Sequence, residues 1–169
     1  MMLRIFSVIL LVVCINSWGE GFTVSSPDLS GQLATQQVYK GFGCSGGNQS
    51  PAINWKNAPA GTKSFAITAY DPDAPTGAGW WHWVMFDIPA SVTQLASDSG
   101  NASQNNLPKG SIQSITSFGE KAFGGACPPV GDKPHQYIFT VHALKVEKLG
   151  LDANATPALV GFMLGQNSL

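Results

Sequence analysis

The fold is decided by one stretch, DPDAPTGAGWWHWVMFD, which runs from Asp71 to Asp87. Its first half cannot form a helix, because Pro72 and Pro75 fix the backbone φ angle and remove hydrogen-bond donors. Its second half alternates as a β-strand does, so we expect His82 to point the same way as Trp80, beneath the preceding loop. The alternation predicts two faces, with Trp80, His82, Val84 and Phe86 on one and Trp81, Trp83 and Met85 on the other. This arrangement predicts a small polar pocket.

The first 21 residues have the pattern of a secretory signal peptide. A basic start at Arg4 is followed by an apolar run from Ile5 to Ile15 and then by small residues. Cleavage after Gly19 or Gly21 would leave a single domain over residues 22–169. The apolar run is too short to span a bilayer comfortably. We therefore expect a periplasmic or secreted protein with no transmembrane segment once the signal is removed.

The charge balance excludes two classes of partner. The net charge is −1, so neither a nucleic-acid-binding surface nor a basic stripe for a membrane surface is predicted. Arg4 is the only arginine, and it leaves with the signal peptide. The mature domain must then bind any anion without a guanidinium group, through backbone N–H groups, histidine, a tyrosine hydroxyl or lysine.

The mature part keeps two cysteines, Cys44 and Cys127. An even pair in an exported protein favours a disulfide. Two separate buried thiols are the alternative. Metal binding is less favoured, because neither cysteine has a partner at the short spacing of zinc sites.

Short apolar runs separated by Gly, Pro, Asn and Ser clusters indicate a mainly β domain. The predicted strands are Phe22–Ser25, Ile53–Trp55, Ser64–Tyr70, Trp80–Asp87 and Tyr137–Val146. Both faces of the last strand are largely apolar, which predicts a central strand that is covered on both sides. Helix is scarce, with one short turn expected over Ser91–Leu95. A better helix is predicted over 156–164, where Thr156 caps it and Pro157 takes the first helical position.

A second dense segment, GGACPPVGDKPHQY, covers positions 124–137. Its glycines permit close approach of the backbone to a ligand, and its prolines stiffen the loop. The loop delivers His135 and Tyr137 to the start of a strand. Together with Asp71, Asp73 and His82, these residues predict a site that has carboxylate, imidazole and phenol groups but no strong nucleophile.

The two segments resemble the paired signatures of the phosphatidylethanolamine-binding protein family, and more closely those of its bacterial Raf-kinase-inhibitor-like branch. The resemblance extends over nearly all of the mature chain. It includes three further motifs, GFGC at Gly41–Cys44, GNQSP at Gly47–Pro51 and PAGTKSF at Pro59–Phe65. Motifs of this length in this order are highly specific. The resemblance implies a β-sandwich-like fold with a large antiparallel sheet, and we expect one or two short peripheral helices.

The resemblance also implies a non-catalytic protein with a small anion pocket at one end of the sheet. Such pockets accept phosphate, acetate or a phospholipid head group such as phosphoethanolamine, and we expect no cofactor and no metal. The family includes kinase and protease inhibitors, which implies a modulating role towards an unidentified protein target. The ligand-binding residues implied are Asp71, Trp80, His82, Cys127, Pro128, Pro129, His135 and Tyr137.

The chain departs from the family pattern at two places. Gln136 stands where arginine is common, and we expect its side chain to face solvent. The chain ends at Leu169, some residues short of where relatives usually end. We therefore expect a domain that is short at its carboxyl end, with an open sheet edge or a less covered pocket.

Two catalytic alternatives stay open. The stretch GCSGG at 43–47 matches the Gly-x-Ser-x-Gly pattern that surrounds the nucleophile of serine hydrolases. In those enzymes the pattern forms a sharp turn from a strand into a helix, and Asn48–Pro51 cannot start that helix. Asp71, His82 and His135 are residue types that suit zinc with an open position. A metal- or water-dependent hydrolase that uses these three residues is therefore the alternative function.

Overall fold

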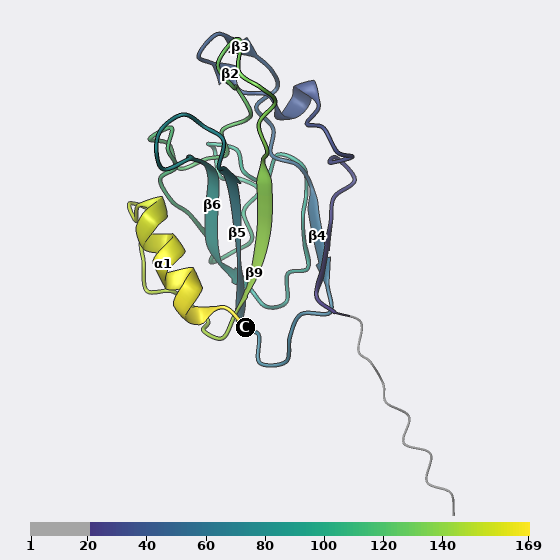
Figure 1. Ribbon diagram of the computed structural model, residues 1–169. Helices are drawn as coiled ribbons and strands as arrows, with labels where there is room; N and C mark the ends of the chain where they lie inside the picture. The colour runs from purple at the N-terminus through teal and green to yellow at the C-terminus, as the bar shows by residue number, and fades with distance from the viewer. Residues whose placement is uncertain (1–20) are drawn as a thin grey trace, which may run out of the picture.

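The computed structural model describes residues 21–169, and the expected signal peptide falls almost wholly outside the described residues (Figure 1). The larger sheet has the strand order β8-β6-β5-β9, from β5 (Ser64–Asp71), β6 (Trp80–Pro89), β8 (Ile112–Gln113) and β9 (Ile138–Leu144). The smaller sheet has the order β1-β4-β7, from β1 (Thr23–Ser25), β4 (Ile53–Lys56) and β7 (Gln94–Leu95). All pairings in both sheets are antiparallel, as predicted.

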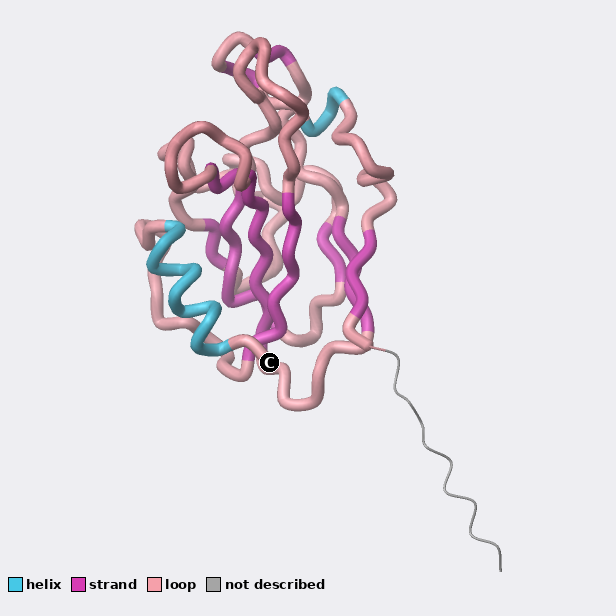
Figure 2. Tube along the Cα trace, in the orientation of Figure 1, coloured by secondary structure: helices cyan, strands magenta, loops and turns pink. Residues whose placement is uncertain are grey.

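Two helices and a hairpin complete the described elements. A short 3₁₀ helix, η1 (Thr35–Gln37), precedes the hairpin of β2 (Lys40–Gly41) and β3 (Cys44–Ser45). The helix α1 (Pro157–Asn167) packs on the outer face of the larger sheet (Figure 2). None of the helices between residues 21 and 169 is long and apolar enough to cross a membrane.

The core is divided into two layers by the larger sheet. One layer lies between the two sheets, where Trp55 of β4 packs with Phe65 of β5 and Trp83 of β6. The other lies between the larger sheet and α1, where Phe86 and Leu144 pack with Val160. Phe65, Ile67 and Ala69, at alternate positions of β5, all belong to the layer between the sheets.

The start of α1 agrees with its predicted signals. The Thr156 side chain accepts a hydrogen bond from the N–H of Leu159 at 3.4 Å, and Pro157 takes the first helical position, where no donor is needed. The helix runs through Asn167, three residues beyond the predicted end. Its extra turn is closed by the N–H of Ser168, which donates to the Leu164 carbonyl at 2.9 Å.

Two local predictions were wrong. Ser91–Leu95 forms a turn and then β7, because the backbone of Gln94 and Leu95 pairs with β4. The strand predicted over Tyr137–Val146 is β9, and within the described residues it is the outer strand of the larger sheet rather than a central one. Its two apolar faces arise because Val141 packs between the sheets while Leu144 packs toward α1.

Candidate functional site

The site begins at an irregularity in β6. Ala69 pairs with Trp83 and Tyr70 pairs with Trp81, so His82 is an extra residue without a partner on β5. A bulge of this kind interrupts the alternation of side chains. Trp81 therefore packs in the α1 layer, against the prediction that it shares a face with Trp83 and Met85. His82 and Trp80 still point the same way, because both line one cavity.

That cavity has a volume of about 190 Å³ and lies between the loop after β5, β6 and the segment before β9. The structure brings all eight residues expected in the pocket to its lining. They are Asp71, Trp80, His82, Cys127, Pro128, Pro129, His135 and Tyr137. We call it the head-group cavity. Its lining also contains five residues that the sequence analysis did not single out as ligand contacts: Phe42, Ala74, Pro75, Thr76 and Phe118.

A buried ion pair joins the two halves of the site. The Nδ1–H of His135 donates to Asp71 Oδ2 at 2.7 Å, and the two side chains are only 2% and 4% exposed. The other ring nitrogen, Nε2, lies 3.4 Å from Asp132 Oδ2. Burial lowers the pKa of His135, but the hydrogen bonds and charges of these two carboxylates outweigh it and raise the pKa. The surroundings therefore favour the protonated ring, because its two nitrogens both face carboxylate oxygens.

Carboxylates also fix the two loops that meet at this pair. The second oxygen of Asp71 accepts the N–H of Asp73 at 2.8 Å and closes the turn after β5. Asp73 contacts the opposite loop. Its carboxylate accepts the N–H of Gln136 at 2.8 Å and lies 3.1 Å from the Lys133 ammonium. The side chain of Gln136 is exposed, as predicted.

His82 has a defined tautomer. Its Nδ1 lies 2.7 Å from the Gly124 carbonyl, and because a carbonyl only accepts, Nδ1 carries the proton. The N–H of Gly124 donates back to the His82 carbonyl at 2.8 Å, so this loop is held firmly against β6. Burial lowers the pKa of His82, and the opposing effects of the Gly124 carbonyl and Asp71 do not restore it. The neutral ring therefore offers the lone pair of Nε2 to the cavity.

Two buried polar atoms of the cavity lack partners among the described residues. They are Nε2 of His82 and the hydroxyl of Tyr137. Burial, together with the charges of Asp71 and Asp73, raises the pKa of Tyr137 to about 12, so the hydroxyl is a neutral donor. The Tyr137 and His82 rings meet edge to face with centroids 5.1 Å apart. One acceptor and one donor on adjacent rings that line the cavity are thus left without a partner.

Aromatic rings form the wall of the cavity opposite the ion pair. Phe118 contacts Trp80 and His82 edge to face, with both centroid distances at 5.3 Å, and it stacks on Phe42 at 6.0 Å. A side chain at Gly124 would clash with the Phe118 ring, because an added Cβ would lie only 2.3 Å from it. The glycine therefore permits close approach of this ring.

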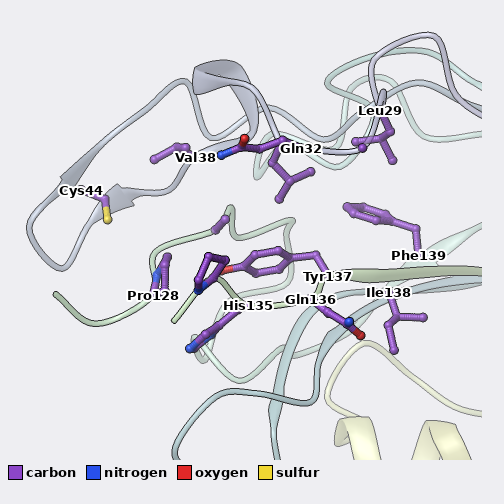
Figure 3. Close-up of a pocket in the computed structure, with 14 residues that line it drawn as sticks. Leu29, Gln32, Val38, Cys44, Pro128, His135, Gln136, Tyr137, Ile138 and Phe139 are labelled. Atoms are coloured by element: carbon purple, nitrogen blue, oxygen red, sulfur yellow. The ribbon is translucent and has the colours of Figure 1, made fainter. Parts of the chain in front are cut away.

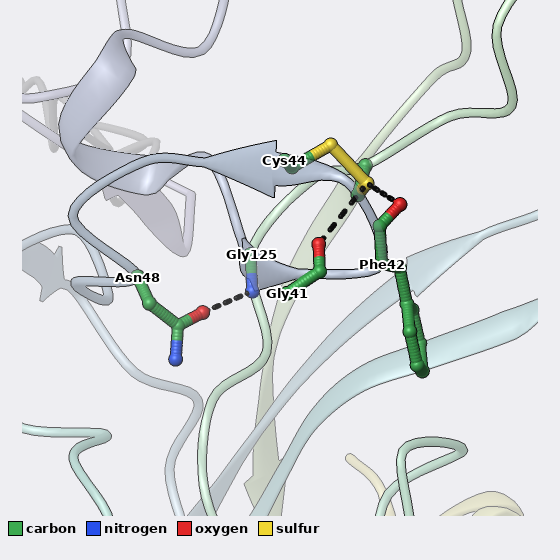
Figure 4. Close-up of a disulfide and its surroundings, with 6 residues drawn as sticks. Gly41, Phe42, Cys44, Asn48 and Gly125 are labelled. Carbon is green, nitrogen blue, oxygen red and sulfur yellow. Dashed lines mark hydrogen bonds between the residues drawn. A yellow bond between two sulfur atoms is a disulfide. The ribbon is translucent and has the colours of Figure 1, made fainter.

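A disulfide holds the hairpin of β2 and β3 over the cavity. Cys44 and Cys127 are bonded, with Cα atoms 6.0 Å apart, as the even cysteine count predicted (Figure 4). The Cys127 sulfur lies 3.7 Å from the Gly41 carbonyl and 3.8 Å from that of Phe42. Beside the bridge, the N–H of Gly125 donates to Asn48 Oδ1 at 2.7 Å. The bridge thereby fixes Phe42 next to the loop that carries Pro128.

The arrangement does not favour the catalytic alternatives. Ser45 lies in the short strand β3, and no helix follows the GCSGG stretch. Cys127 is oxidised and cannot act as a thiolate. Within residues 21–169, no cluster of three His, Cys, Asp or Glu side chains is arranged to hold a metal ion. His135 already directs both ring nitrogens at carboxylates.

Sequence comparison relates the chain to one family. The family model described as phosphatidylethanolamine-binding protein matches residues 25–169. The UPF0098 protein YbcL of Escherichia coli strain K12 is 50% identical over 167 residues, which cover 98% of this chain and 91% of YbcL. The UPF0098 protein YbhB of the same strain is 46% identical over 138 residues, which cover 82% of this chain and 86% of YbhB.

Comparison with solved structures agrees. The crystal structure of E. coli YbcL, described there as a new member of the mammalian PEBP family, matches with a TM-score of 0.87 at 54% identity. The match covers 89% of this chain and 93% of that one. The fold and these matches together show that the chain belongs to the phosphatidylethanolamine-binding protein family.

Proposed function

We propose that this chain is an exported, non-catalytic binding protein whose head-group cavity takes a small anion or a phospholipid head group such as phosphoethanolamine. The observation that carries the proposal is the pair of buried, unpartnered polar atoms, Nε2 of His82 and the Tyr137 hydroxyl. Buried polar atoms are normally hydrogen-bonded, so such a pair in a cavity favours a ligand as the missing partner. The volume of about 190 Å³ limits that ligand to a small group.

The chemistry of a phosphate group fits these two atoms. A phosphate oxygen accepts from the Tyr137 hydroxyl, and a protonated phosphate oxygen donates to His82 Nε2. A fully ionised phosphate instead requires that His82 take up a proton, which gives a charge-assisted hydrogen bond. Because burial lowers the pKa of His82 in the free protein, an ionised phosphate that needs the protonated ring should bind more strongly as the pH falls.

Calorimetric titration with inorganic phosphate and with phosphoethanolamine tests the proposal. His82→Gln should lower the affinity for both at least about tenfold, or 1.4 kcal/mol, and should flatten the pH dependence. His142→Gln is the matched control. His142 is also largely buried, but its Nε2 faces Thr68 Oγ1 at 3.3 Å, and it does not line the cavity. Equal binding by both variants would contradict the proposal.

The alternative hydrolase is a separate outcome of the same experiments. Turnover of a phosphate or carboxylate ester that His82→Gln abolishes and His142→Gln retains would overturn the non-catalytic assignment. Stoichiometric zinc in the purified protein would do the same.

The proposal also includes modulation of a protein target, and an exported chain would not meet a cytosolic kinase of its own cell. A pulldown from the native compartment with saturating phosphoethanolamine is the direct test of that part.

Export is supported by the amino-terminal pattern and by the Cys44–Cys127 bridge, since disulfides persist in oxidising compartments. We propose a periplasmic or secreted location. Mass spectrometry of the protein from an exporting host should give a chain that begins at Glu20 or Phe22 and has no free thiol. An intact amino terminus in the cytosolic fraction would contradict this.

A further inference from the structure

The Cys44–Cys127 bridge belongs to the wall of the head-group cavity. Cys127 lines that cavity together with the two prolines that follow it, and Phe42, which also lines it, is two residues before Cys44. Figure 3 shows the Cys44 sulfur directed toward the segment that carries Pro128. Both cysteines are partly exposed, so a small dithiol can reach the bridge.

Other contacts hold the base of the hairpin without the bridge. The N–H of Tyr39 donates to the Ala126 carbonyl at 2.9 Å, and the N–H of Ala126 donates to the Gln37 carbonyl at 3.0 Å. The N–H of Gly125 donates to the Asn48 side chain at 2.7 Å. These bonds tie both arms of the hairpin to the segment that leads to the bridge, and none of them involves a cysteine. Reduction of the bridge therefore leaves the base of the hairpin in place.

The tip of the hairpin, residues 40–45, depends on the bridge. Its two strands, β2 and β3, pair with each other and with no other described strand. Beyond that pairing, the bridge joins the tip to the loop of Cys127, and Phe42 stacks on Phe118 with the ring centroids 6.0 Å apart. The bridge is the one disulfide of the described chain, and it ties the tip covalently to the cavity wall.

Phe42 adopts a backbone conformation that its residue type disfavours. Its φ is +53° and that of Gly43 is +88°, so both central residues of the two-residue turn are in the left-handed region. Asparagine, aspartate or glycine is preferred at the first of these positions, and a bulky residue persists there only where the surrounding structure holds it. The side chain is 74% exposed, so burial holds it little. The bridge is the constraint that keeps this turn, and with it the ring, against the cavity.

We propose that the bridge is a redox gate of the head-group cavity: the oxidised form holds Phe42 in the wall, and reduction frees the tip and weakens ligand binding. The inference rests on the proposed head-group function. The reductant is a dithiol. One of its thiolates attacks a bridge sulfur and displaces the other cysteine as a thiolate, which takes up a proton; its second thiol then resolves the mixed disulfide. Two electrons and two protons pass to the protein, and the dithiol becomes a disulfide.

The gate makes binding depend on the compartment. In a reducing compartment the tip would be free and the cavity wall incomplete, and oxidation after export would complete it. Binding and reduction are linked, so a ligand that binds the oxidised form tenfold more tightly makes the bridge harder to reduce by the same factor. For a two-electron couple, that factor corresponds to about 30 mV.

Calorimetric titration with inorganic phosphate, in the absence of oxygen, compares the oxidised protein with the protein reduced by dithiothreitol. Reduction should weaken phosphate binding at least about tenfold. In mixtures of reduced and oxidised dithiothreitol, saturating phosphate should lower the reduction potential of the bridge by at least about 30 mV. Hydrogen exchange should show that the amides of residues 40–45 lose protection on reduction, whereas those of β5 and β6 keep it.

Two variants test whether the gate acts through the Phe42 ring. Phe42→Asn keeps the bridge and gives the turn a residue that accepts a positive φ, but it removes the ring. Its phosphate affinity should change less than about threefold on reduction. Phe162→Asn is the matched control, because Phe162 is exposed on α1 and does not line the cavity. This control should keep the full difference between the oxidised and the reduced protein.

The outcomes separate the gate from the head-group proposal. If the oxidised protein binds neither phosphate nor phosphoethanolamine, the head-group proposal fails and the gate fails with it. Equal phosphate binding in the two redox states would overturn the gate alone. So would a redox difference that survives in Phe42→Asn. Loss of protection in β5 and β6 on reduction would also overturn it, since the bridge would then maintain the whole fold rather than the tip.

Discussion

Replacement of Asp71 by asparagine should destabilise the protein strongly at acidic pH and only weakly at alkaline pH. The Asp71–His135 pair is buried, and the substitution leaves the imidazolium with only the partly exposed Asp132 as a counter-charge. Loss of one partner of a buried pair costs about 3–5 kcal/mol. Because the pair borders a cavity that solvent can reach, we take the lower end, about 3 kcal/mol near pH 5.5.

The pH dependence follows from the direction of the pKa shift. The pKa of His135 is raised in the folded protein above its ordinary value of about 6.5. Its charge therefore adds stability that is fully present below pH 6.5 and is lost as the pH rises through the folded pKa. In Asp71→Asn the largest cause of the raised pKa is gone and burial remains. Above the folded pKa the ring is neutral in both proteins. There we expect a difference of only about 1 kcal/mol, because the asparagine oxygen still accepts the His135 N–H and replaces a hydrogen bond to a charged group by a neutral one.

Urea unfolding at several pH values between about 5.5 and 9 measures both differences, provided that the m-value stays constant. The matched control is Asp73→Asn, the same substitution two residues away. Asp73 pairs with the exposed Lys133, and an asparagine oxygen can still accept the Gln136 N–H. This control should have a small effect that does not depend on pH. A loss in Asp71→Asn that is equal at both pH extremes, or equal to that of Asp73→Asn, would refute the reasoning.

Three further perturbations separate ligand binding from stability. Tyr137→Phe removes a buried hydroxyl without a partner, so unfolding in urea should show a gain of about 1–3 kcal/mol, while calorimetry shows phosphate affinity lower by about tenfold. The double variant Cys44→Ser, Cys127→Ser should lower the free energy of unfolding by about 4–5 kcal/mol, because the bridge joins residues 83 apart and restricts the unfolded chain. A loss below about 1 kcal/mol would contradict this account of the bridge. Thr156→Ala should cost about 1 kcal/mol in urea unfolding, and Thr156→Ser, which keeps the capping oxygen, should cost almost nothing.

Local patterns were enough to predict the long strands of the fold. The alternation of apolar residues in Ser64–Tyr70 and Trp80–Asp87 matches β5 and β6 within two residues at each end. The two-residue strands, such as β7 and β8, carry no such pattern, since only their partners define them. The outer position of β9 could not be predicted either. Its composition reflects burial on both faces, and burial does not say which edge is paired.

The site was predictable in residue type but not in geometry. The pairing of Asp71 with His135 spans 64 residues, and no local spacing encodes it. The bulge at His82 is set by the register of β5 against β6, and for that reason the face of Trp81 was assigned wrongly. Phe42 and Phe118 were missed because an aromatic residue in a loop gives no sign of whether it fills a core or lines a cavity. Phe118 contacts both Phe42, which the disulfide-bonded hairpin carries, and Trp80 of β6, and these contacts join segments far apart in the sequence.

The free cavity keeps two buried polar atoms without hydrogen-bond partners, and this opposes folding. Each buried polar atom without a partner costs about 1–3 kcal/mol, so His82 Nε2 and the Tyr137 hydroxyl together oppose folding by about 2–6 kcal/mol. Water in the cavity would reduce this cost, but a ligand that satisfies both atoms removes it. The surrounding ion pair, the Gly124 hydrogen bonds and the disulfide all act on the walls and none of them on these two atoms. Rigid walls around two unsatisfied atoms are expected of a binding site that is formed before its ligand arrives, since the cost of ordering the site is then already met in the free protein.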